Sequence, residues 1–253
     1  MEREESNINA EYAKQSLFRF KQFAMLNCVD GLKIGSDGVL LGAWTDVNAA
    51  ESIWDIGTGT GVIALMAAQR ALPSCYITAF EIDPKAAAVA ARNFAASPWH
   101  SRMKVIEGEA LSVIAERSII GVAPDIILSN PPYFAKSASL ATRCAERDTA
   151  RREGSLCFES LIKLGATRLS PTGRLCFISP ADRREDIEWH AAFYGLNIRH
   201  TTEVVTKEGR LPSRILWELS RLAGSLTTDK LVIRDSSGNY TKAYQLLTND
   251  YYL

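Results

Sequence analysis

Short apolar runs alternate with longer, helix-like stretches over most of the chain. The runs have the length of strands, and the stretches between them have the length and apolar spacing of helices that pack on a sheet. This alternation predicts βαβ units, and therefore a parallel sheet with helices on both faces. The predicted strands of this series are 52–56, 76–80, 103–106, 124–128 and 173–178, and the main helices are 62–71, 85–96, 158–168 and 183–194.

The pattern changes toward the C-terminus. Residues 197–205 and 215–220 are strand-like, and the stretch between them has no helical pattern. Two strands joined without a helix predict an antiparallel hairpin, here at the edge of the sheet. A short strand over 231–234 and a helix near 241–247 are expected to finish the fold.

The N-terminal part also departs from the alternation. Residues 18–23 alternate apolar and polar side chains, which predicts a strand paired with 24–28 or with the segment near Leu32. The following Ser36-Asp37 pair can cap a helix that runs to about Trp44. No repeat, low-complexity tract or linker interrupts the chain, so a single domain over 1–253 is predicted.

Composition excludes several classes of protein. The chain of 253 residues is 47% hydrophobic and 23% charged, as in an ordinary protein with a core. No apolar run approaches the roughly 20 residues needed to span a bilayer, and the polar N-terminus does not resemble a signal peptide. The five cysteines form no C-x-x-C pair and the three histidines lack metal-ligand spacing. We therefore expect reduced thiols, a cytoplasmic location, and neither a metal nor a membrane partner.

The overall charge argues against binding nucleic acid by bulk attraction. Lysine plus arginine and aspartate plus glutamate both total 29, so the formal net charge is zero. Proteins that hold nucleic acid by bulk charge are usually basic. A nucleic-acid substrate therefore requires that the positive groups gather on one face.

A glycine-rich loop follows the first strand of the βαβ series. Gly57, Gly59 and Gly61 have the spacing G-x-G-x-G, with Thr58 inside the loop and Asp55 just before it. In open α/β sheets, ligands bind outside the carboxyl ends of the strands where the strand order reverses. An acid beside the loop would repel the pyrophosphate of a dinucleotide, but it can hold an amino group directly or through water. The loop therefore favours S-adenosylmethionine over NAD.

Further acids follow the next two strands. Glu81 ends the second strand, where a carboxylate can accept hydrogen bonds from both hydroxyls of a ribose. Asp83 is better placed to cap the next helix. Glu109 follows the third strand and is placed to meet the adenine of the cofactor. A helix cap or a solvated charge would explain any one acid. Three acids at three successive strand ends, namely Asp55, Glu81 and Glu109, favour a nucleoside-containing cofactor.

The fourth strand of the series ends in Asn130-Pro131-Pro132-Tyr133. Proline has no N–H and fixes φ, and the residue before it is held extended, so this segment cannot continue the sheet. Its carbonyls and the Asn130 amide are left as rigid acceptors beside an aromatic ring. A planar ligand with an NH2 group fits these groups, and the alternative is a proline turn with a buried tyrosine.

Taken together, the motifs resemble those of class I S-adenosylmethionine-dependent methyltransferases, in the amino-methyltransferase branch that carries N-P-P-Y. Further segments are similar to the bacterial tRNA1(Val) adenine-37 N6-methyltransferase family, and the likeness covers nearly the whole chain. Two positions depart from the family pattern: Ser36 stands where threonine is usual and Glu109 where aspartate is usual. The segments that carry the family likeness are 18–23, 33–44, 97–99, 211–212 and 231–234.

This resemblance implies a Rossmann-like class I methyltransferase fold, with a seven-stranded, mostly parallel sheet, an antiparallel last strand and helices on both faces. Residues 1–48 would form an N-terminal extension that covers the cofactor site, 49–220 the core and 221–253 a C-terminal extension. Asp37 would lie against the cofactor. The implied partner is tRNA, and a monomer is expected.

The implied reaction is direct transfer of the sulfonium methyl of S-adenosylmethionine to N6 of an adenine in a tRNA anticodon loop. Asn130 and Pro131 would accept the two N6–H bonds, Pro132 would keep the segment rigid, and Tyr133 would stack on the base. Two groups of basic residues are expected to meet tRNA phosphates. Arg143, Arg147 and Arg151 follow N-P-P-Y and should lie near the active-site mouth, and Arg210 and Arg214 belong to a second local group.

Other readings remain open. N-P-P-Y also suits a glutamine carboxamide, but glutamine methyltransferases carry a helical domain before the core, and only about 50 residues precede the glycine loop here. Methylation of adenine in rRNA or DNA is a further alternative. Enzymes that act on DNA usually carry a distinct target-recognition domain, and no such segment is visible here. An NAD-linked oxidoreductase is disfavoured by Asp55, and a non-catalytic RNA-binding module would not need the cofactor acids.

Overall fold

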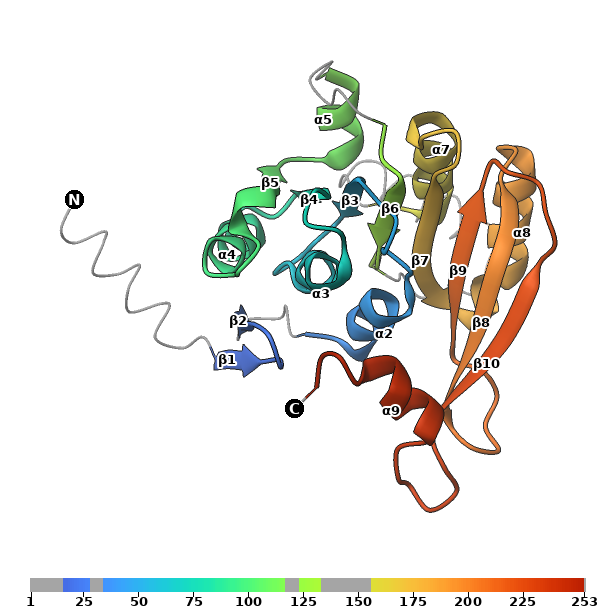
Figure 1. Cartoon of the computed structure of the whole chain (residues 1–253). Coiled ribbons are helices and arrows are strands. Elements are labelled where there is room, and N and C mark those ends of the chain that lie inside the picture. The colour runs from blue at the N-terminus through green and yellow to red at the C-terminus, as the bar shows by residue number, and fades with distance from the viewer. Residues whose placement is uncertain (1–15, 28–33, 117–122, 133–155, 253) are drawn as a thin grey trace, which may run out of the picture.

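The structure is a computed structural model that describes residues 16–27, 34–116, 123–132 and 156–252. Near the N-terminus, β1 (Ser16–Arg19) and β2 (Ala24–Asn27) form an antiparallel hairpin. The other strands form one large sheet (Figure 1). They are β3 (Ser52–Ile56), β4 (Tyr76–Glu81), β5 (Met103–Glu107), β6 (Ile126–Ser129), β7 (Arg174–Pro180), β8 (Asn197–Lys207), β9 (Arg214–Ser220) and β10 (Thr227–Arg234).

The large sheet has the order β10-β8-β9-β7-β6-β3-β4-β5. Strands β3 to β8 run parallel to one another, and β9 lies antiparallel between β7 and β8. This arrangement confirms the predicted parallel series, the hairpin and the antiparallel seventh strand. The strand order reverses at β3, which pairs with β4 on one side and β6 on the other. A ligand site is therefore expected at the carboxyl end of β3.

An eighth strand corrects two expectations. β10 begins at Thr227 rather than at 231 and pairs in parallel with β8, so the sheet has eight strands in the described residues rather than seven. The β8–β9 hairpin is consequently not at the edge. The first half of β10 consists of exposed polar residues with no apolar alternation, so only its pairing with β8 defines it as a strand.

Helices cover both faces of the sheet, as predicted. Side chains of β6 alternate between the two cores, with Ile126 and Leu128 on one face and Ile127 on the other. The first face packs against α2 (Ser36–Trp44), α3 (Val62–Arg70), α4 (Pro84–Ala95) and α9 (Lys242–Thr248). The second packs against α5 (Ala110–Glu116), α7 (Phe158–Arg168) and α8 (Arg184–Phe193). The short 3-10 helices η1 (His100–Arg102) and η2 (Ala181–Arg183) complete the elements.

The N-terminal hairpin differs from the predicted strand. β1 ends at Arg19, and the chain turns so that Phe20 and Phe23 are both buried, with their rings stacked at 4.5 Å. Phe20 also stacks on Tyr252. The apolar positions that suggested one strand over 18–23 are therefore held by ring packing in a turn. The predicted pairing with the following segment is confirmed.

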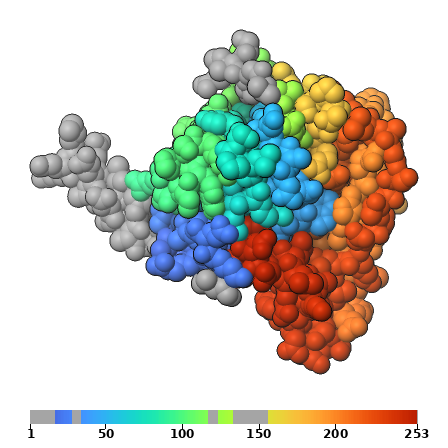
Figure 2. All heavy atoms as spheres, in the orientation of Figure 1, coloured from blue at the N-terminus to red at the C-terminus, as the bar shows by residue number. Residues whose placement is uncertain are grey.

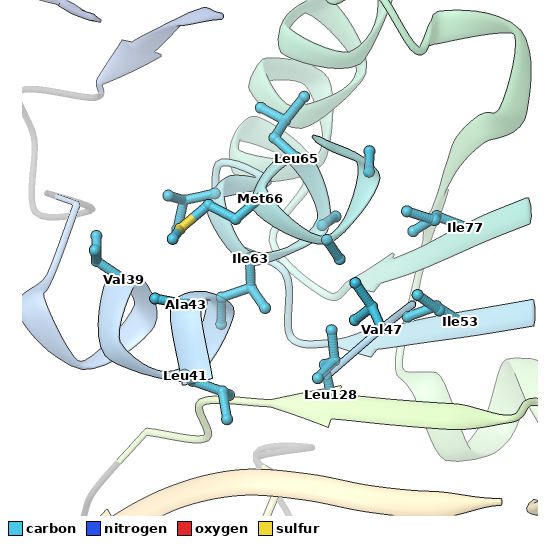
Figure 3. Close-up of a cluster of buried hydrophobic side chains, with 14 of the residues drawn as sticks. Val39, Leu41, Ala43, Val47, Ile53, Ile63, Leu65, Met66, Ile77 and Leu128 are labelled. Atoms are coloured by element: carbon cyan, nitrogen blue, oxygen red, sulfur yellow. The ribbon is translucent and has the colours of Figure 1, made fainter. Parts of the chain in front are cut away.

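Helix α2 starts differently from the prediction as well. Its N-cap residue is Gly35, and Asp37 lies inside the first turn, where its carboxylate pairs with Arg214 instead of capping the helix. α2 packs closely on α3, because a Cβ at Gly42 would lie 2.9 Å from the sulfur of Met66 (Figure 3). The two helices therefore meet through a glycine, with Ile63 and Ala43 in the same apolar cluster.

The C-terminal segment holds the N-terminal elements in place. Tyr251 is fully buried, and its hydroxyl donates to the backbone oxygens of Met66 in α3 (3.1 Å) and Gly42 in α2 (3.5 Å). The backbone N–H of Lys21 donates to Tyr251 O at 2.8 Å. Figure 2 shows the hairpin surface directly beside that of the C-terminal segment. Each helix in the described parts of the chain is too short or too polar to cross a membrane.

Candidate functional site

The glycine loop and the N-P-P segment leave the sheet side by side. In the register of β3 and β6, Ile56 lies opposite Ser129, and the Ser129 hydroxyl donates to Ile56 O at 2.8 Å. The next residues on the two strands are Gly57 and Asn130. The structure thus brings together two motifs that lie far apart in the sequence, at the point where the strand order reverses. Ser129 was not predicted as a site residue. Its position between a buried strand and Asn130 is the sequence feature that could have indicated its role.

Backbone geometry explains the three glycines of the loop. Gly57, Gly59 and Gly61 have φ values of 72°, 58° and 92°, a region that residues with a Cβ rarely adopt. A Cβ at Gly57 or Gly59 would meet nothing within 4 Å, whereas one at Gly61 would lie 2.5 Å from the Phe94 ring. Gly61 is thus needed for packing against α4, while Gly57 and Gly59 leave open space that a ligand can approach.

Asp55 is fully buried beneath the loop. Its Oδ2 accepts hydrogen bonds from the Thr58 hydroxyl at 2.6 Å and from Ala64 N at 3.2 Å, while Oδ1 is buried without a hydrogen-bond partner. Burial raises the pKa of Asp55 from 3.8 to about 7, and the charge of Glu81 adds to this, while the two hydrogen bonds oppose it. The buried carboxyl group therefore fixes the loop and retains one acceptor for a cationic ligand or a water.

Glu81 ties the end of β4 to the same loop. It is 8% exposed, and its two oxygens accept from Gly59 N at 2.7 Å and Asp83 N at 2.9 Å. The Asp83 carboxylate accepts from Lys85 N and Ala86 N, which confirms its predicted role as the cap of α4. A carboxylate oxygen can accept more than one hydrogen bond, so Glu81 keeps capacity for ribose hydroxyls beside the glycine loop.

Glu109 is engaged at the start of α5. Its carboxylate accepts from Leu111 N at 3.1 Å and from Ser112 N at 2.7 Å, which is the geometry of a helix cap. The structure therefore gives Glu109 the cap role that competed with the predicted adenine contact. It lies after β5, next to the carboxyl end of β4. Its approach to a cofactor remains a prediction.

The described part of the N-P-P-Y segment emerges from the sheet at Asn130. Asn130 is half-buried, Pro131 is buried and Pro132 is exposed. Tyr133 and the predicted RNA-contacting arginines of the next segment, Arg143, Arg147 and Arg151, lie outside the described residues.

The other two predicted RNA contacts have different surroundings. Arg214 is the first residue of β9, and its Nε donates to Asp37 Oδ2 at 2.8 Å. This ion pair links α2 to the carboxyl end of β7, since Arg214 lies opposite Pro180. The predicted cofactor ligand and the predicted RNA ligand are therefore paired with each other. Arg210 is exposed in the loop between β8 and β9.

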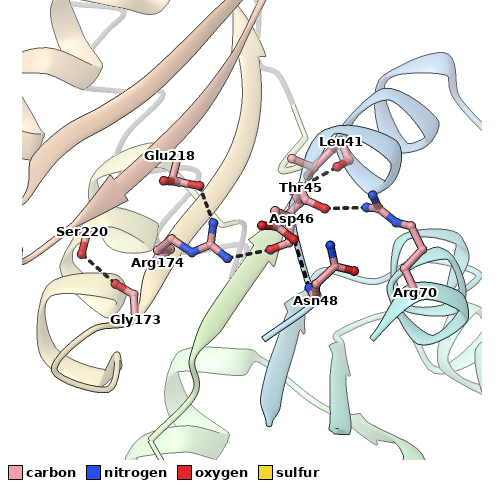
Figure 4. Close-up of polar contacts among 9 residues, drawn as sticks. All are labelled: Leu41, Thr45, Asp46, Asn48, Arg70, Gly173, Arg174, Glu218 and Ser220. Carbon is pink, nitrogen blue, oxygen red and sulfur yellow. Dashed lines mark hydrogen bonds and ion pairs between the residues drawn. The ribbon is translucent and has the colours of Figure 1, made fainter. Parts of the chain in front are cut away.

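Two arginines fix the chain that follows α2. Arg70 donates to the backbone oxygen of Gly42. Figure 4 shows Arg70 also donating to Thr45 O, and Arg174 donating to Asp46 O at 2.6 Å while pairing with Glu218 at 2.8 Å. The C-terminal end of α2 is thus held from α3 and from the sheet. Because a Cβ at Gly38 would lie 3.4 Å from Val62, the first residue of α3, the N-terminal turn of α2 lies close to the glycine loop.

Three of the cysteines lie in the described residues. Cys75, Cys157 and Cys176 are free thiols, and burial raises the pKa of Cys75 to about 11. Among the residues whose positions are described, no cluster of three or more His, Cys, Asp or Glu side chains is arranged to hold a metal ion.

Comparison with known proteins agrees with this geometry. The family described as "Methyltransferase small domain" matches residues 19–186. A crystal structure of a predicted O-methyltransferase from Agrobacterium tumefaciens shares the fold, with a TM-score of 0.62 and 20% identity, and the match covers 85% of this chain and 96% of that one. The fold and site thus define a class I, S-adenosylmethionine-dependent methyltransferase.

Full-length relatives narrow the class. A protein of Bacteroides thetaiotaomicron named tRNA1(Val) (adenine(37)-N6)-methyltransferase is 38% identical over 236 residues, which are 93% of this chain and 97% of the relative. One of the same name from Porphyromonas gingivalis is 41% identical over 244 residues, covering 93% of this chain and 94% of the relative. The chain belongs to the tRNA1(Val) (adenine(37)-N6)-methyltransferase family.

Proposed function

We propose that this enzyme transfers the methyl group of S-adenosylmethionine to N6 of an adenine in a tRNA anticodon loop, with adenine 37 of tRNA1(Val) as the target. The observation that carries this assignment is the register of β3 and β6, which sets Asn130-Pro131-Pro132 beside the glycine loop. The RNA and the nucleotide come from the names of relatives that match 93% of the chain.

The residues present fit the cofactor. Open space over Gly57 and Gly59 allows a ligand to approach the backbone, and the unpartnered Oδ1 of Asp55 is an acceptor for the amino group of a methionine moiety, directly or through water. Glu81 would hold the ribose hydroxyls. Thr58 and Gly61 shape the loop through the Asp55 bond and the contact with Phe94. Asp37 and Glu109 would border the site from α2 and α5.

When bound, S-adenosylmethionine supplies a methyl group already activated on a sulfonium centre, so the protein has to align the acceptor. The N6 lone pair of adenine is delocalised into the ring. The side-chain oxygen of Asn130 and the carbonyl of Pro131 would each accept one N6–H bond, orienting the amine and stabilising the positive charge that develops on it. Pro132 limits the freedom of this segment. The extra proton on N6 can pass to water after the transfer.

The remaining assignments concern the surroundings of the reaction. Tyr133 would stack on the unpaired base, and Arg143, Arg147 and Arg151 would contact phosphates near the mouth of the site. Residues 1–48 would cover the cofactor site as an extension of the core over 49–220, and 221–253 would form the second extension. The packing of α2 on α3 and of Tyr251 on both helices supports this division. We propose that the enzyme acts as a cytoplasmic monomer.

A direct test uses labelled S-adenosylmethionine and total tRNA from cells lacking the modification. The expected product is N6-methyladenosine in one anticodon-loop fragment, located by nuclease digestion and mass spectrometry. Ribosomal RNA, DNA and a glutamine-containing protein fraction serve as competing substrates. Preferential labelling of any of these would overturn the tRNA assignment, and labelling of a tRNA nucleotide other than adenine 37 would overturn the position only.

A second test concerns the cofactor ligands. Asp55→Ala should weaken S-adenosylmethionine binding measured by calorimetry, because it removes both the loop anchor and the acceptor. Asp46→Ala, at an exposed position before β3, is the matched control. Equal affinity of the Asp55 variant and the wild type would refute the assignment of Asp55.

A further inference from the structure

Three planar side chains stack where β10 leads into α9, and we call this stack the column. The rings of Tyr244 and Tyr240 stack at 4.8 Å with an interplanar angle of 24°, and the Arg234 guanidinium lies 4.1 Å from the Tyr240 ring centroid. Arg234 Nη1 also donates to Gly238 O at 2.7 Å. Tyr244 is buried, whereas Tyr240 and Arg234 are exposed. The column therefore fixes a guanidinium at the protein surface.

The loop between β8 and β9 is tied to this turn. Glu208 N donates to Arg234 O at 2.9 Å, and Ser236 N donates to Glu208 Oε2 at 3.1 Å. Lys207 at the end of β8 lies opposite Arg234 at the end of β10. Figure 1 shows the two connections together at the same end of the sheet. They form one surface, which we call the β8–β10 basic surface and define as Lys207, Arg210, Arg234, Tyr240 and Lys242.

The charges of this surface differ from the balance of the whole chain. Its four cationic side chains are all exposed. The two acids of the same connections have their carboxylates turned to the backbone, since Glu208 accepts from Ser236 N and Asp235 accepts from Asn239 N. In a chain with zero formal net charge, this is a local excess of positive charge. Such a patch of exposed cations fits a polyanion.

The surface is continuous with the carboxyl edge of the sheet. The β8–β9 loop ends at Arg214, which pairs with Asp37 of α2, and Ser213 O accepts from Ala181 N just after β7. Asn130, after β6, and the basic surface, after β8 and β10, therefore lie at the same edge of the sheet. The methyl transfer itself requires no cations at the ends of β8 and β10, since β7 and β9 lie between these strands and β6.

We propose that the β8–β10 basic surface binds the phosphate backbone of the RNA substrate, with Arg234 as its pre-positioned phosphate ligand. The inference rests on the proposed function in that the polyanion is the tRNA being methylated. Stacking on Tyr240 limits the rotamers of Arg234 before binding, so less side-chain entropy is lost when a phosphate is bound.

Binding of unmodified tRNA by the full-length enzyme, measured over a series of salt concentrations, tests this surface. Arg234→Gln should weaken binding roughly tenfold, the size of a charge-assisted hydrogen bond at the low end of its range. The slope of log affinity against log salt should fall by about 1, because one phosphate contact is lost. Lys242→Gln, at the exposed first residue of α9, should lower the slope without removing the Arg234–Tyr240 stack.

Matched controls separate the possible outcomes. Arg168→Gln alters an exposed arginine at the end of α7, away from this surface, and should leave affinity and slope unchanged. In steady-state assays Arg234→Gln should raise KM for tRNA and leave the affinity for S-adenosylmethionine unchanged. Wild-type affinity and slope in both Arg234→Gln and Lys242→Gln would overturn the inference while tRNA methylation stands. Failure of the wild type to methylate tRNA would instead overturn the proposed function.

Discussion

The two sides of the proposed active site hold their charged groups in opposite ways. At the ends of β3 and β4, the carboxylates of Asp55 and Glu81 are buried. Asp55 accepts from the Thr58 hydroxyl and from Ala64 N in α3, and Glu81 accepts from Gly59 N of the glycine loop. At the ends of β8 and β10, Arg210 and Arg234 are exposed. The first side is a rigid, desolvated cradle for a small cofactor, and the second is an open electrostatic surface for a large polyanion. On the first side, stability should therefore depend on packing and pH. On the second side, RNA affinity should depend on salt concentration.

Substitution of Asn130 should have the largest effect, because this residue follows β6 directly beside the glycine loop at the end of β3. Asn130→Ala removes a proposed acceptor of the N6–H bond, so methylation of tRNA should fall by about 10²–10³-fold, as when one oriented polar group is removed from an active site. The affinities for cofactor and tRNA should stay near those of the wild type. Single-turnover methylation with both ligands saturating measures the effect, and Asn48→Ala at an exposed position is the matched control. Near-normal rates in Asn130→Ala would remove Asn130 from the mechanism.

The rigidity of the cofactor side can be tested at two glycines with positive φ. Gly61→Ala should destabilise the protein by about 3 kcal/mol or more, because it adds backbone strain and a Cβ placed 2.5 Å from the Phe94 ring. Gly57→Ala adds strain alone and should lower stability by about 1 kcal/mol. Urea unfolding without ligand compares the two variants. Equal losses would show that the loop and α4 move apart to accommodate the side chain.

The buried carboxyl group gives the cofactor side a pH dependence. The pKa of Asp55 is about 7 in the folded protein and 3.8 as its ordinary value, so between these two pH values the folded state holds a proton that the unfolded chain has lost. Stability contributed by this group is complete below pH 4 and falls as pH rises to 7, at about 1.4 kcal/mol per pH unit. The stability of the wild type relative to Asp55→Asn should therefore fall by about 2.5 kcal/mol between pH 5 and pH 7.

Urea unfolding at the two pH values gives this difference, and Asp46→Asn corrects for the loss of a carboxylate at an exposed position. A difference that does not change with pH would mean that Asp55 is ionised in the ligand-free protein. In that case a cation or a water must bond to its Oδ1 before the cofactor binds.

Local signals account for what the sequence predicted well. The glycine loop, the Asp83 cap and the alternation of strands and helices depend on residues close together in the chain, and the structure confirms them. The strand predicted over 18–23 is confirmed only at Phe18 and Arg19, and the chain turns at Phe20, which packs against Tyr252 at the opposite end of the chain. The start of β10 was missed because exposed polar residues become a strand only through pairing with β8. In the candidate site, Arg214 was assigned to RNA, and its partner Asp37 is 177 positions away.

The Asp37–Arg214 pair should have the smallest effect, although it joins the two sides of the site. Its side chains are 19% and 33% exposed, so solvent screens the attraction and a double-mutant cycle of Asp37→Asn and Arg214→Gln should give a coupling of about 0.5–1 kcal/mol in stability. High salt should weaken this coupling. Binding can be measured on the same two variants. If Asp37→Asn alters the affinity for tRNA and Arg214→Gln alters the affinity for the cofactor, the ion pair couples the two binding sites. Independent effects of the two substitutions on their own ligands would show that the two sides work separately.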